Sequence, residues 1–313
     1  MNDNPVISIY VATYNHERYI VKALDSIREQ KTKYSYEVLV GEDVSTDNTR
    51  QLLKQYEKQH PGFMTVYYRD HNMHHEDPNN SKDLKMRCKG KYVIALEGDD
   101  YWIDPLKLQK QVDFLENHEE YLAVAHRCVV VDENSENKNE KYQECLDTEY
   151  TLKHFISGIM PGQLATVMCR NYLREELFDT SFANITIMPG DRRLYFSLAS
   201  NGKVYCIPEV MSAYRHVTSG GSSFSANIKP NFERNRKWHE AALDYAYKIE
   251  KAESIRCAEL MYALEIRKGI FTRSISIKNA VKEINKVKHK WRTLRLMFRR
   301  DWRHFVLKKS VWI

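Results

Sequence analysis

The chain contains no run of eighteen consecutive apolar residues, about the length that a helix needs to cross a bilayer. We therefore expect no membrane-spanning segment. None of its six cysteines lies in a C-x-x-C pair, which argues against a zinc or redox motif. Several fall inside apolar runs, so we expect reduced core cysteines. Residues 6–20 contain no glycine, so no glycine-rich phosphate loop is expected there.

With 313 residues, 42% of them hydrophobic, the chain is long enough to bury a large core. This length suits one large domain, or one domain with an appendage. The polar start Asn2-Asp3-Asn4 leads directly into a predicted strand without a signal peptide, so we expect a cytoplasmic protein.

The net charge of +6 is unevenly distributed. Residues 276–313 contain 12 lysines and arginines against 2 acidic residues, a net charge of +10, which leaves −4 on the rest of the chain. The acidic body argues against nucleic-acid binding, whereas the basic tail is expected to meet an anionic partner.

Strands and helices alternate through the first hundred residues. Short apolar runs predict strands at 6–11, 36–40, 65–68 and 92–96. Apolar residues at helical spacing predict helices at 17–29, 49–59 and 83–89. This alternation predicts a parallel sheet with right-handed crossovers, in which ligands gather at the carboxyl ends of the strands.

The later elements follow less regular patterns. A helix is predicted to begin at Asp104-Pro105, with Asp104 as its N-cap. Further strands are predicted at 122–131, 166–169 and 204–207, the last of them short and followed by Pro208. From residue 231 onward the pattern is helical.

The fourth strand ends in Glu97-Gly98-Asp99-Asp100, three carboxylates in four residues. Acids at the end of a buried strand cost desolvation energy unless a partner neutralises them. A divalent cation suits clustered oxygen ligands and can in turn hold a diphosphate. The alternative is an acidic surface turn whose aspartates cap a helix. The first two strands also end in polar residues, at 12–15 and 42–43, and the fold brings all three ends to one edge.

Four motifs occur in an order and spacing that resemble a known family. They are Thr13-Tyr14-Asn15, the acidic turn 42–47, the turn 97–99, and a later group made of Asp191, Pro208-Glu209 and Tyr214-Arg215-His216. Through them, residues 5–225 resemble glycosyltransferase family 2, whose members have a GT-A fold. The resemblance implies an α/β protein with a Rossmann-like mixed sheet flanked by helices, a nucleotide-sugar donor and an inverting transfer.

The resemblance also implies roles for the matching residues. The nucleotide would be bound by side chains that follow three of the strands, namely Thr13, Tyr14, Asn15, Glu17, Glu42, Asp43 and Glu97. Asp99, with His216, would hold Mn²⁺ or Mg²⁺, which acts as a Lewis acid on the leaving diphosphate. Asp100, Trp102 and Arg215 would contact the donor sugar or the acceptor. Asp191 would be the general base that takes the proton of the acceptor hydroxyl.

For several of these residues a structural role is the alternative. The turn at 42–47 and Asp191 are both placed to cap helices. Trp102 also suits the core, and Arg215 also suits a pair with a surface acid.

Some positions depart from the family pattern. Glu42 and Glu97 stand where aspartate is commoner, and Gly190 stands where many members carry glutamate. Val44 replaces a glycine, so we expect no positive φ at that turn. The usual basic residue after the third strand has no clear counterpart, and the candidates are Arg69, Lys85 and Arg87.

Aromatic and apolar residues recur at helical spacing near the C-terminus, at Trp291, Leu294, Phe298, Trp302 and Phe305, with basic residues around them. A helix of this kind suits an anionic membrane surface, so 288–313 is a candidate membrane contact. Packing on the catalytic domain or on a second subunit is the alternative, which leaves a homo-oligomer open.

These patterns lead to one expected organisation. Residues 1–225 form the catalytic domain, with 1–104 binding the nucleotide sugar and 105–225 the acceptor, and 226–313 form a basic helical region. The expected enzyme moves a sugar from a UDP-sugar, with dTDP- and GDP-sugars as alternative donors, to a lipid-linked saccharide used for a bacterial surface polysaccharide. It would work in the cytoplasm or on the inner face of the membrane.

Two other functions compete with this one. The first is a sugar nucleotidyltransferase, which the lack of a glycine-rich loop disfavours. The second is a non-catalytic nucleotide- or saccharide-binding relative, which the presence of both Asp99 and Asp191 disfavours.

Overall fold

The computed structural model describes residues 4–73, 81–184, 189–217 and 231–305. The chain divides into two compact units. The first contains residues 1–150, 160–178 and 201–228, and the second contains 151–159, 179–200 and 229–313. Neither unit is one continuous stretch of chain.

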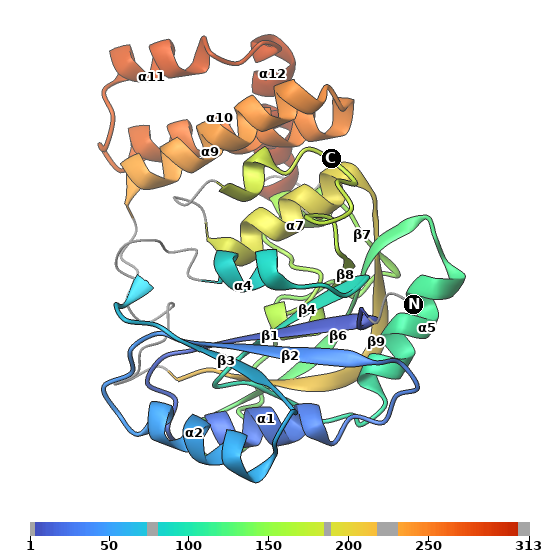
Figure 1. Cartoon of the computed structure of the whole chain (residues 1–313). Coiled ribbons are helices and arrows are strands. Elements are labelled where there is room, and N and C mark those ends of the chain that lie inside the picture. The colour runs from blue at the N-terminus through green and yellow to red at the C-terminus, as the bar shows by residue number, and fades with distance from the viewer. Residues whose placement is uncertain (1–3, 74–80, 185–188, 218–230, 306–313) are drawn as a thin grey trace. The chain divides into compact units, whose positions relative to one another are not determined.

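A mixed sheet forms the centre of the first unit (Figure 1). Its path, in the part of the chain that the structure describes, is β3-β2-β1-β4-β8-β6-β9-β5, and β7 pairs with β9. The four parallel strands are β1 (Ile7–Thr13), β2 (Tyr36–Glu42), β3 (Thr65–Tyr68) and β4 (Tyr92–Glu97). All four were predicted from their apolar runs, and their carboxyl ends lie at one edge of the sheet.

The second half of the sheet mixes both strand directions. It contains β8 (Met168–Arg170), β6 (Tyr121–Val131), β9 (Lys203–Arg215), β5 (Tyr101–Trp102) and β7 (Glu149–Tyr150). The β9 strand is longer than the predicted 204–207. Its register against β6 shifts between Ile207 and Val210, and this irregularity accommodates Pro208, which has no N–H to donate.

Helices α1 (Ile20–Arg28) and α2 (Thr49–Gln59) lie on one face of the parallel strands, and α4 (Lys82–Arg87) lies on the other (Figure 1). The buried stripe of α1 is Ile20, Ala23, Leu24 and Ile27, as its spacing predicted. Helix α5 (Lys107–Asn117) begins later than predicted, because the Asp104 carboxylate accepts the Leu106 N–H in the turn before it.

The six cysteines are free and buried, as expected of core residues. The predicted strand 166–169 begins two residues late, at Met168. Residues 164–166 form a 3₁₀ turn instead (η1, Leu164–Thr166), because the Gln163 side chain accepts the Ala165 N–H at 2.6 Å.

The second unit is helical in its described residues. Its elements are α6 (Leu152–Ile156), η2 (Ser181–Asn184), α7 (Gly190–Asn201), α9 (Phe232–Ile249), α10 (Ala252–Phe271), α11 (Ile277–Ile284) and α12 (Lys290–Phe305). Aromatic rings form much of its core, where Phe182 stacks on Tyr245 and both contact Phe196. A search of the described helices finds none that is long and apolar enough to span a bilayer.

Candidate active site

The loop after β1 is hydrogen-bonded to the loop after β2. The Asn15 N–H donates to Ser45 Oγ at 3.0 Å, and Asn15 Oδ1 accepts the Thr46 N–H at 2.8 Å. Glu17 Oε2 accepts both the backbone N–H of Asn48, at 2.9 Å, and its side-chain amide, at 2.8 Å. Two of the residues predicted to bind nucleotide, Asn15 and Glu17, therefore hold these loops together at the carboxyl edge.

Asp43 follows β2 and pairs with the basic residue that follows β3. Its side chain is buried, with Oδ1 3.2 Å from Arg69 Nη1 and 2.8 Å from the Met73 N–H that donates to it. Arg69 also pairs with Asp83 at 2.6 Å. Of the three basic candidates, Arg69 is the one that the structure places beside the acidic turn.

Glu42, the last residue of β2, is fully buried. Its Oε1 accepts the Ser45 N–H at 2.6 Å, and its Oε2 accepts Arg50 Nε of α2 at 2.5 Å. Both carboxylate oxygens have partners inside the chain, so Glu42 anchors the turn to α2. Its role in nucleotide binding stays a prediction.

The turn at Val44 differs from the sequence expectation. Val44 has a φ of 60°, so the expectation that this turn needs no positive φ is wrong. A β-branched residue rarely adopts this conformation, because its Cβ crowds the backbone. The pairing of Asp43 with Arg69 before it, and the bond from the Ser45 N–H to Glu42 after it, hold the backbone there.

The acidic turn after β4 packs on the loop after β1. The Asp99 side chain is 25% exposed, and its Oδ2 lies 3.9 Å from His16 Nε2. His16 Nδ1 in turn lies 3.2 Å from Thr13 Oγ1. A side chain at Gly98 has no room, because its Cβ would come within 2.7 Å of both His16 and Thr13. Sequence reasoning missed His16, although it follows the Thr-Tyr-Asn motif directly.

Asp100 points into the protein. Its Oδ1 accepts the Arg215 N–H at 2.7 Å, and its Oδ2 accepts the Gln163 side-chain amide at 2.7 Å. The same amide donates to Glu97 at 3.1 Å. Burial, and then the charges of Asp99 and Glu97, raise the pKa of Asp100 well above its usual range. A cation near these carboxylates would relieve their repulsion.

Arg215 and Trp102 both lie inside the first unit. The Arg215 guanidinium donates to the backbone carbonyls of Asp99, at 2.9 Å, and Asp132, at 2.6 Å. Trp102 is 4% exposed, and its Nε1 donates to the Ala165 carbonyl at 3.1 Å. Of the two roles left open for Trp102, the structure therefore favours the core. A contact of Arg215 with the donor sugar stays a prediction.

His216, one of the two predicted metal ligands, is paired with an acid. His216 Nδ1 lies 2.8 Å from Glu140 Oε2. In the ranges that the structure describes, no three His, Cys, Asp or Glu side chains are grouped to hold a metal ion. Asp99 nonetheless fits a cation such as Mg²⁺, which takes one or two carboxylates and completes its shell with water and phosphate oxygens. Asp99 and His216 remain predicted ligands.

Asp191 lies in the second unit, in the first turn of α7. Its Oδ1 accepts the Arg192 N–H at 2.7 Å. Burial raises the pKa of Asp191, and the hydrogen bond and charge of Arg192 oppose the rise only in part. Tyr14, in the first unit, is half-buried. The roles predicted for Asp191 and Tyr14 therefore stay predictions.

The sequence and the fold both have counterparts among known proteins. The sequence profile described as Glycosyl transferase family 2 matches residues 8–175, more than half of the chain. A protein of Mycobacterium bovis is 33% identical over 219 residues, which make up 68% of this chain and 60% of that protein. TuaG of Bacillus subtilis, named for teichuronic acid biosynthesis, is 29% identical over 224 residues, 71% of this chain and 83% of TuaG.

A solved structure shares the fold. The crystal structure of S. aureus TarS residues 1–349 with UDP-GlcNAc matches with a TM-score of 0.62 and 16% identity, over 89% of this chain and 78% of that one. The mixed sheet and flanking helices are thus those of a GT-A fold. The chain belongs to glycosyltransferase family 2. Its match spans about 60% of the mycobacterial relative's length.

Proposed function

We propose that the chain is an inverting glycosyltransferase that moves a sugar from a nucleoside-diphosphate sugar, with UDP the first candidate, to a saccharide acceptor. The observation that carries this proposal is the turn 97–100. Gln163 and Arg215 bind Glu97 and Asp100 from inside the protein, while the Asp99 side chain beside the β1 loop is 25% exposed. The Asp99 carboxylate is therefore accessible to a ligand.

The chain's own residues supply the remaining chemistry of the proposal. Asp43, which pairs with Arg69, would accept a hydrogen bond from the base of the nucleotide. A divalent cation held by Asp99, with His216 as a second ligand, would offset the charge of the leaving diphosphate. Asp191 would take the proton as the acceptor oxygen bonds to the anomeric carbon and the bond to the diphosphate breaks.

The substrates and the cellular site are proposed on further grounds. TarS was crystallised with UDP-GlcNAc, and TuaG is named for teichuronic acid biosynthesis, so a UDP-sugar and a lipid-linked saccharide are tested first. The basic segment 288–313 would hold the enzyme at the inner face of the membrane. The domain division at residue 225 and a homo-oligomer are proposals as well.

A thermal-shift screen tests the donor site. The chain without substitutions, called the parent here, is titrated with UDP, dTDP, GDP, CDP and ADP, each with Mn²⁺ or with a chelator. A ligand at a hundredfold excess over its Kd stabilises the folded state by about 2.7 kcal/mol. We expect a metal-dependent shift with UDP that Asp99→Asn removes. Glu29→Gln, which changes an exposed acid of the first unit by the same charge, should keep it.

Three results would contradict the proposal. A thermal shift of equal size with chelator would show that donor binding does not need the metal. A shift of equal size in Asp99→Asn would show that donor binding does not need Asp99. If none of the five nucleotides stabilises the parent, the chain does not use a nucleotide donor in this way.

A further inference from the structure

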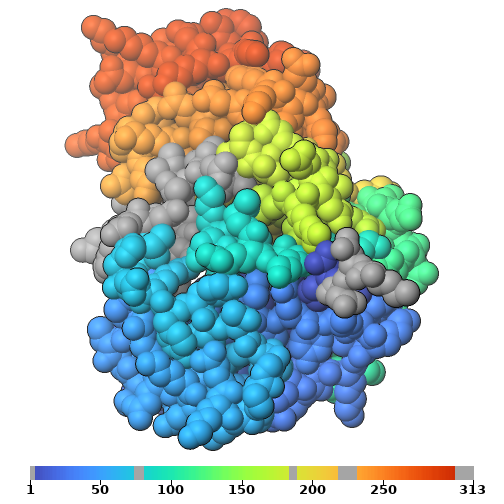
Figure 2. All heavy atoms as spheres, in the orientation of Figure 1, coloured from blue at the N-terminus to red at the C-terminus, as the bar shows by residue number. Residues whose placement is uncertain are grey.

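A recess lies in the first unit, on the face of the sheet that α4 covers. Its volume is about 710 Å³, within the range of small-molecule sites. It extends from Tyr67 of β3 past α4 to residues beside the amino ends of β1 and β4, among them Asn4 and Lys89. The motif loops of the proposed donor site follow the carboxyl ends of those strands. The α4 side of this face lies at the surface in Figure 2.

The recess is lined by four cations and, among the described residues, by no acid. The cations are Lys85, Arg87, Lys89 and Arg174. Outside the basic tail the chain carries a net charge of −4, so this cluster does not follow from the general composition. Like charges brought together repel one another, and an anion between them removes that cost.

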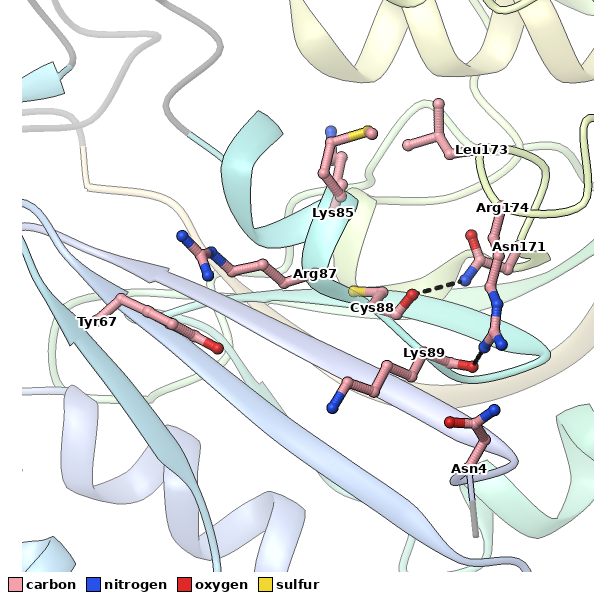
Figure 3. Close-up of a pocket in the computed structure, with 10 residues that line it drawn as sticks. Asn4, Tyr67, Lys85, Arg87, Cys88, Lys89, Asn171, Leu173 and Arg174 are labelled. Atoms are coloured by element: carbon pink, nitrogen blue, oxygen red, sulfur yellow. Dashed lines mark hydrogen bonds between the residues drawn. The ribbon is translucent and has the colours of Figure 1, made fainter. Parts of the chain in front are cut away.

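Both arginine guanidinium groups of the recess are held in place by contacts within the chain. The Arg87 guanidinium lies 4.6 Å from the centre of the Tyr67 ring, a cation–π contact. Arg174 Nη1 donates to the backbone carbonyl of Lys89. Figure 3 shows Arg87 directed toward Tyr67, and Arg174 lying over the Lys89 backbone. Side chains fixed in this way lose little entropy when they bind.

The backbone that carries Lys89 is also fixed. The buried Asn171 amide donates to the carbonyls of Cys88, at 3.1 Å, and Gly90, at 2.9 Å. The Lys89 N–H donates to Glu37 Oε1 at 2.8 Å. Gly90 approaches β1 so closely that a Cβ there would lie 2.6 Å from the Ser8 nitrogen. The floor of the recess is therefore rigid.

We propose that this recess is a binding site for a polyanion whose charges are phosphate or carboxylate groups, separate from the donor site. Arginine presents paired N–H donors that match both groups, and lysine adds charge without a fixed geometry. The volume admits more than a single phosphate, so an anionic saccharide or a diphosphate suits it better than an isolated ion. The proposal does not depend on the proposed function.

Direct binding by calorimetry tests the site. In the presence of chelator, the full chain is titrated with inorganic pyrophosphate, with trigalacturonate and with neutral maltotriose. The test variant is Arg87→Gln with Arg174→Gln. The matched control is Lys31→Gln with Lys58→Gln, which removes the same charge from exposed positions of the same unit. Lys89→Gln, which removes a single charge, serves as a second test variant.

We expect pyrophosphate, trigalacturonate or both to bind the parent, and maltotriose not to bind. The arginine pair should weaken binding by about tenfold or more, and Lys89→Gln by a smaller factor. Pyrophosphate alone would identify a phosphate ligand, and trigalacturonate alone an acidic saccharide. Equal weakening in the lysine control, or no binding of either anion to the parent, would overturn the proposal. The UDP shift of all variants is measured alongside, so failure of the donor site is seen separately.

Discussion

At the scale of single residues, the acids at the carboxyl edge divide into two kinds. Glu42 and Asp100 are buried and have hydrogen-bond partners on both carboxylate oxygens. Asp99 keeps a quarter of its side chain exposed and has a histidine 3.9 Å away. The buried acids shape the turns, so substitution of either should affect folding as well as binding, whereas Asp99 can be changed with less risk to the fold.

Val44 provides a test of how much strain this edge contains. Its φ of 60° costs a β-branched residue about 1–2 kcal/mol. Val44→Ala loses the side chain and keeps most of that cost, while Val44→Gly removes it. We expect Val44→Gly to be more stable than Val44→Ala by about 1 kcal/mol in urea unfolding.

At a position inside a helix, we expect the opposite order of stability for the glycine and alanine variants. Gln55 is exposed in the middle of α2, where glycine should be less stable than alanine by about 1 kcal/mol. If Val44→Gly and Val44→Ala have the same stability, or follow the order seen at Gln55, the backbone at Val44 is not strained in solution.

The identities of these acids were readable from the sequence, but their partners were not. Arg50 lies only eight residues from Glu42, whereas Gln163 and Arg215 are 63 and 115 residues from Asp100. Local patterns carry no information on pairings at such separations. The same limit explains why Trp102 could not be assigned to the core before the Ala165 carbonyl was seen beside it.

At the scale of elements, β1, β2 and β4 were predicted well because each contains an apolar run that is buried along most of its length. Of the later strands, β6 was predicted within one residue of its bounds, whereas the others were predicted less well or not at all. Two of them, β5 and β7, have two residues each, and no periodicity can mark so short a strand. Pro208 also concealed the length of β9, because a proline usually ends a strand and here lies at a register shift.

Helix α7 carries the next prediction, because Asp191 lies in its first turn and is the proposed general base. Asparagine keeps the side-chain oxygen that accepts the Arg192 N–H but cannot accept the proton. We therefore expect Asp191→Asn to keep its Tm and its UDP shift while kcat falls by about 10²- to 10⁴-fold. Turnover is measured as nucleotide released in the presence of acceptor.

The pH profile provides an independent check on Asp191. Because burial raises its pKa, the kcat of the parent should fall on the acid side at a higher pH than an ordinary aspartate would give. Asp191→Ala should lose both the hydrogen bond to the Arg192 N–H and the base. If Asp191→Asn turns over at the parental rate, the role of Asp191 is structural and the base lies elsewhere.

At the scale of the whole molecule, the sequence correctly predicted an α/β portion followed by helices from residue 231 onward. It did not predict that the helical unit would also take up 151–159 and 179–200, since those segments precede the last strand of the sheet. Such interleaving depends on contacts between distant segments. One of these is the stacking of Phe182 on Tyr245 of α9.

The basic tail has an exposed apolar side, as a membrane contact requires. Buried Glu259 of α10 accepts hydrogen bonds from Arg292, at 2.9 Å, and Thr293, at 3.2 Å, which fixes that side of α12. Trp291 and Phe298 remain 77% and 74% exposed. The side chains of Trp302 and Phe305 lie outside the described residues. An exposed aromatic pair on a helix rich in arginine suits an anionic lipid surface.

Vesicle sedimentation tests this contact on the full chain. We expect binding to vesicles with phosphatidylglycerol and little binding to neutral vesicles, with loss of affinity at high salt. Trp291→Ser with Phe298→Ser should weaken binding by about tenfold or more, because both rings would otherwise enter the interface.

The control variant is Leu146→Ser with Ile103→Ser. It removes exposed apolar side chains of the first unit, 72% and 46% exposed, and should leave binding unchanged. If the aromatic pair instead alters the mass measured by light scattering and has no effect on vesicles, this surface binds a second copy of the chain.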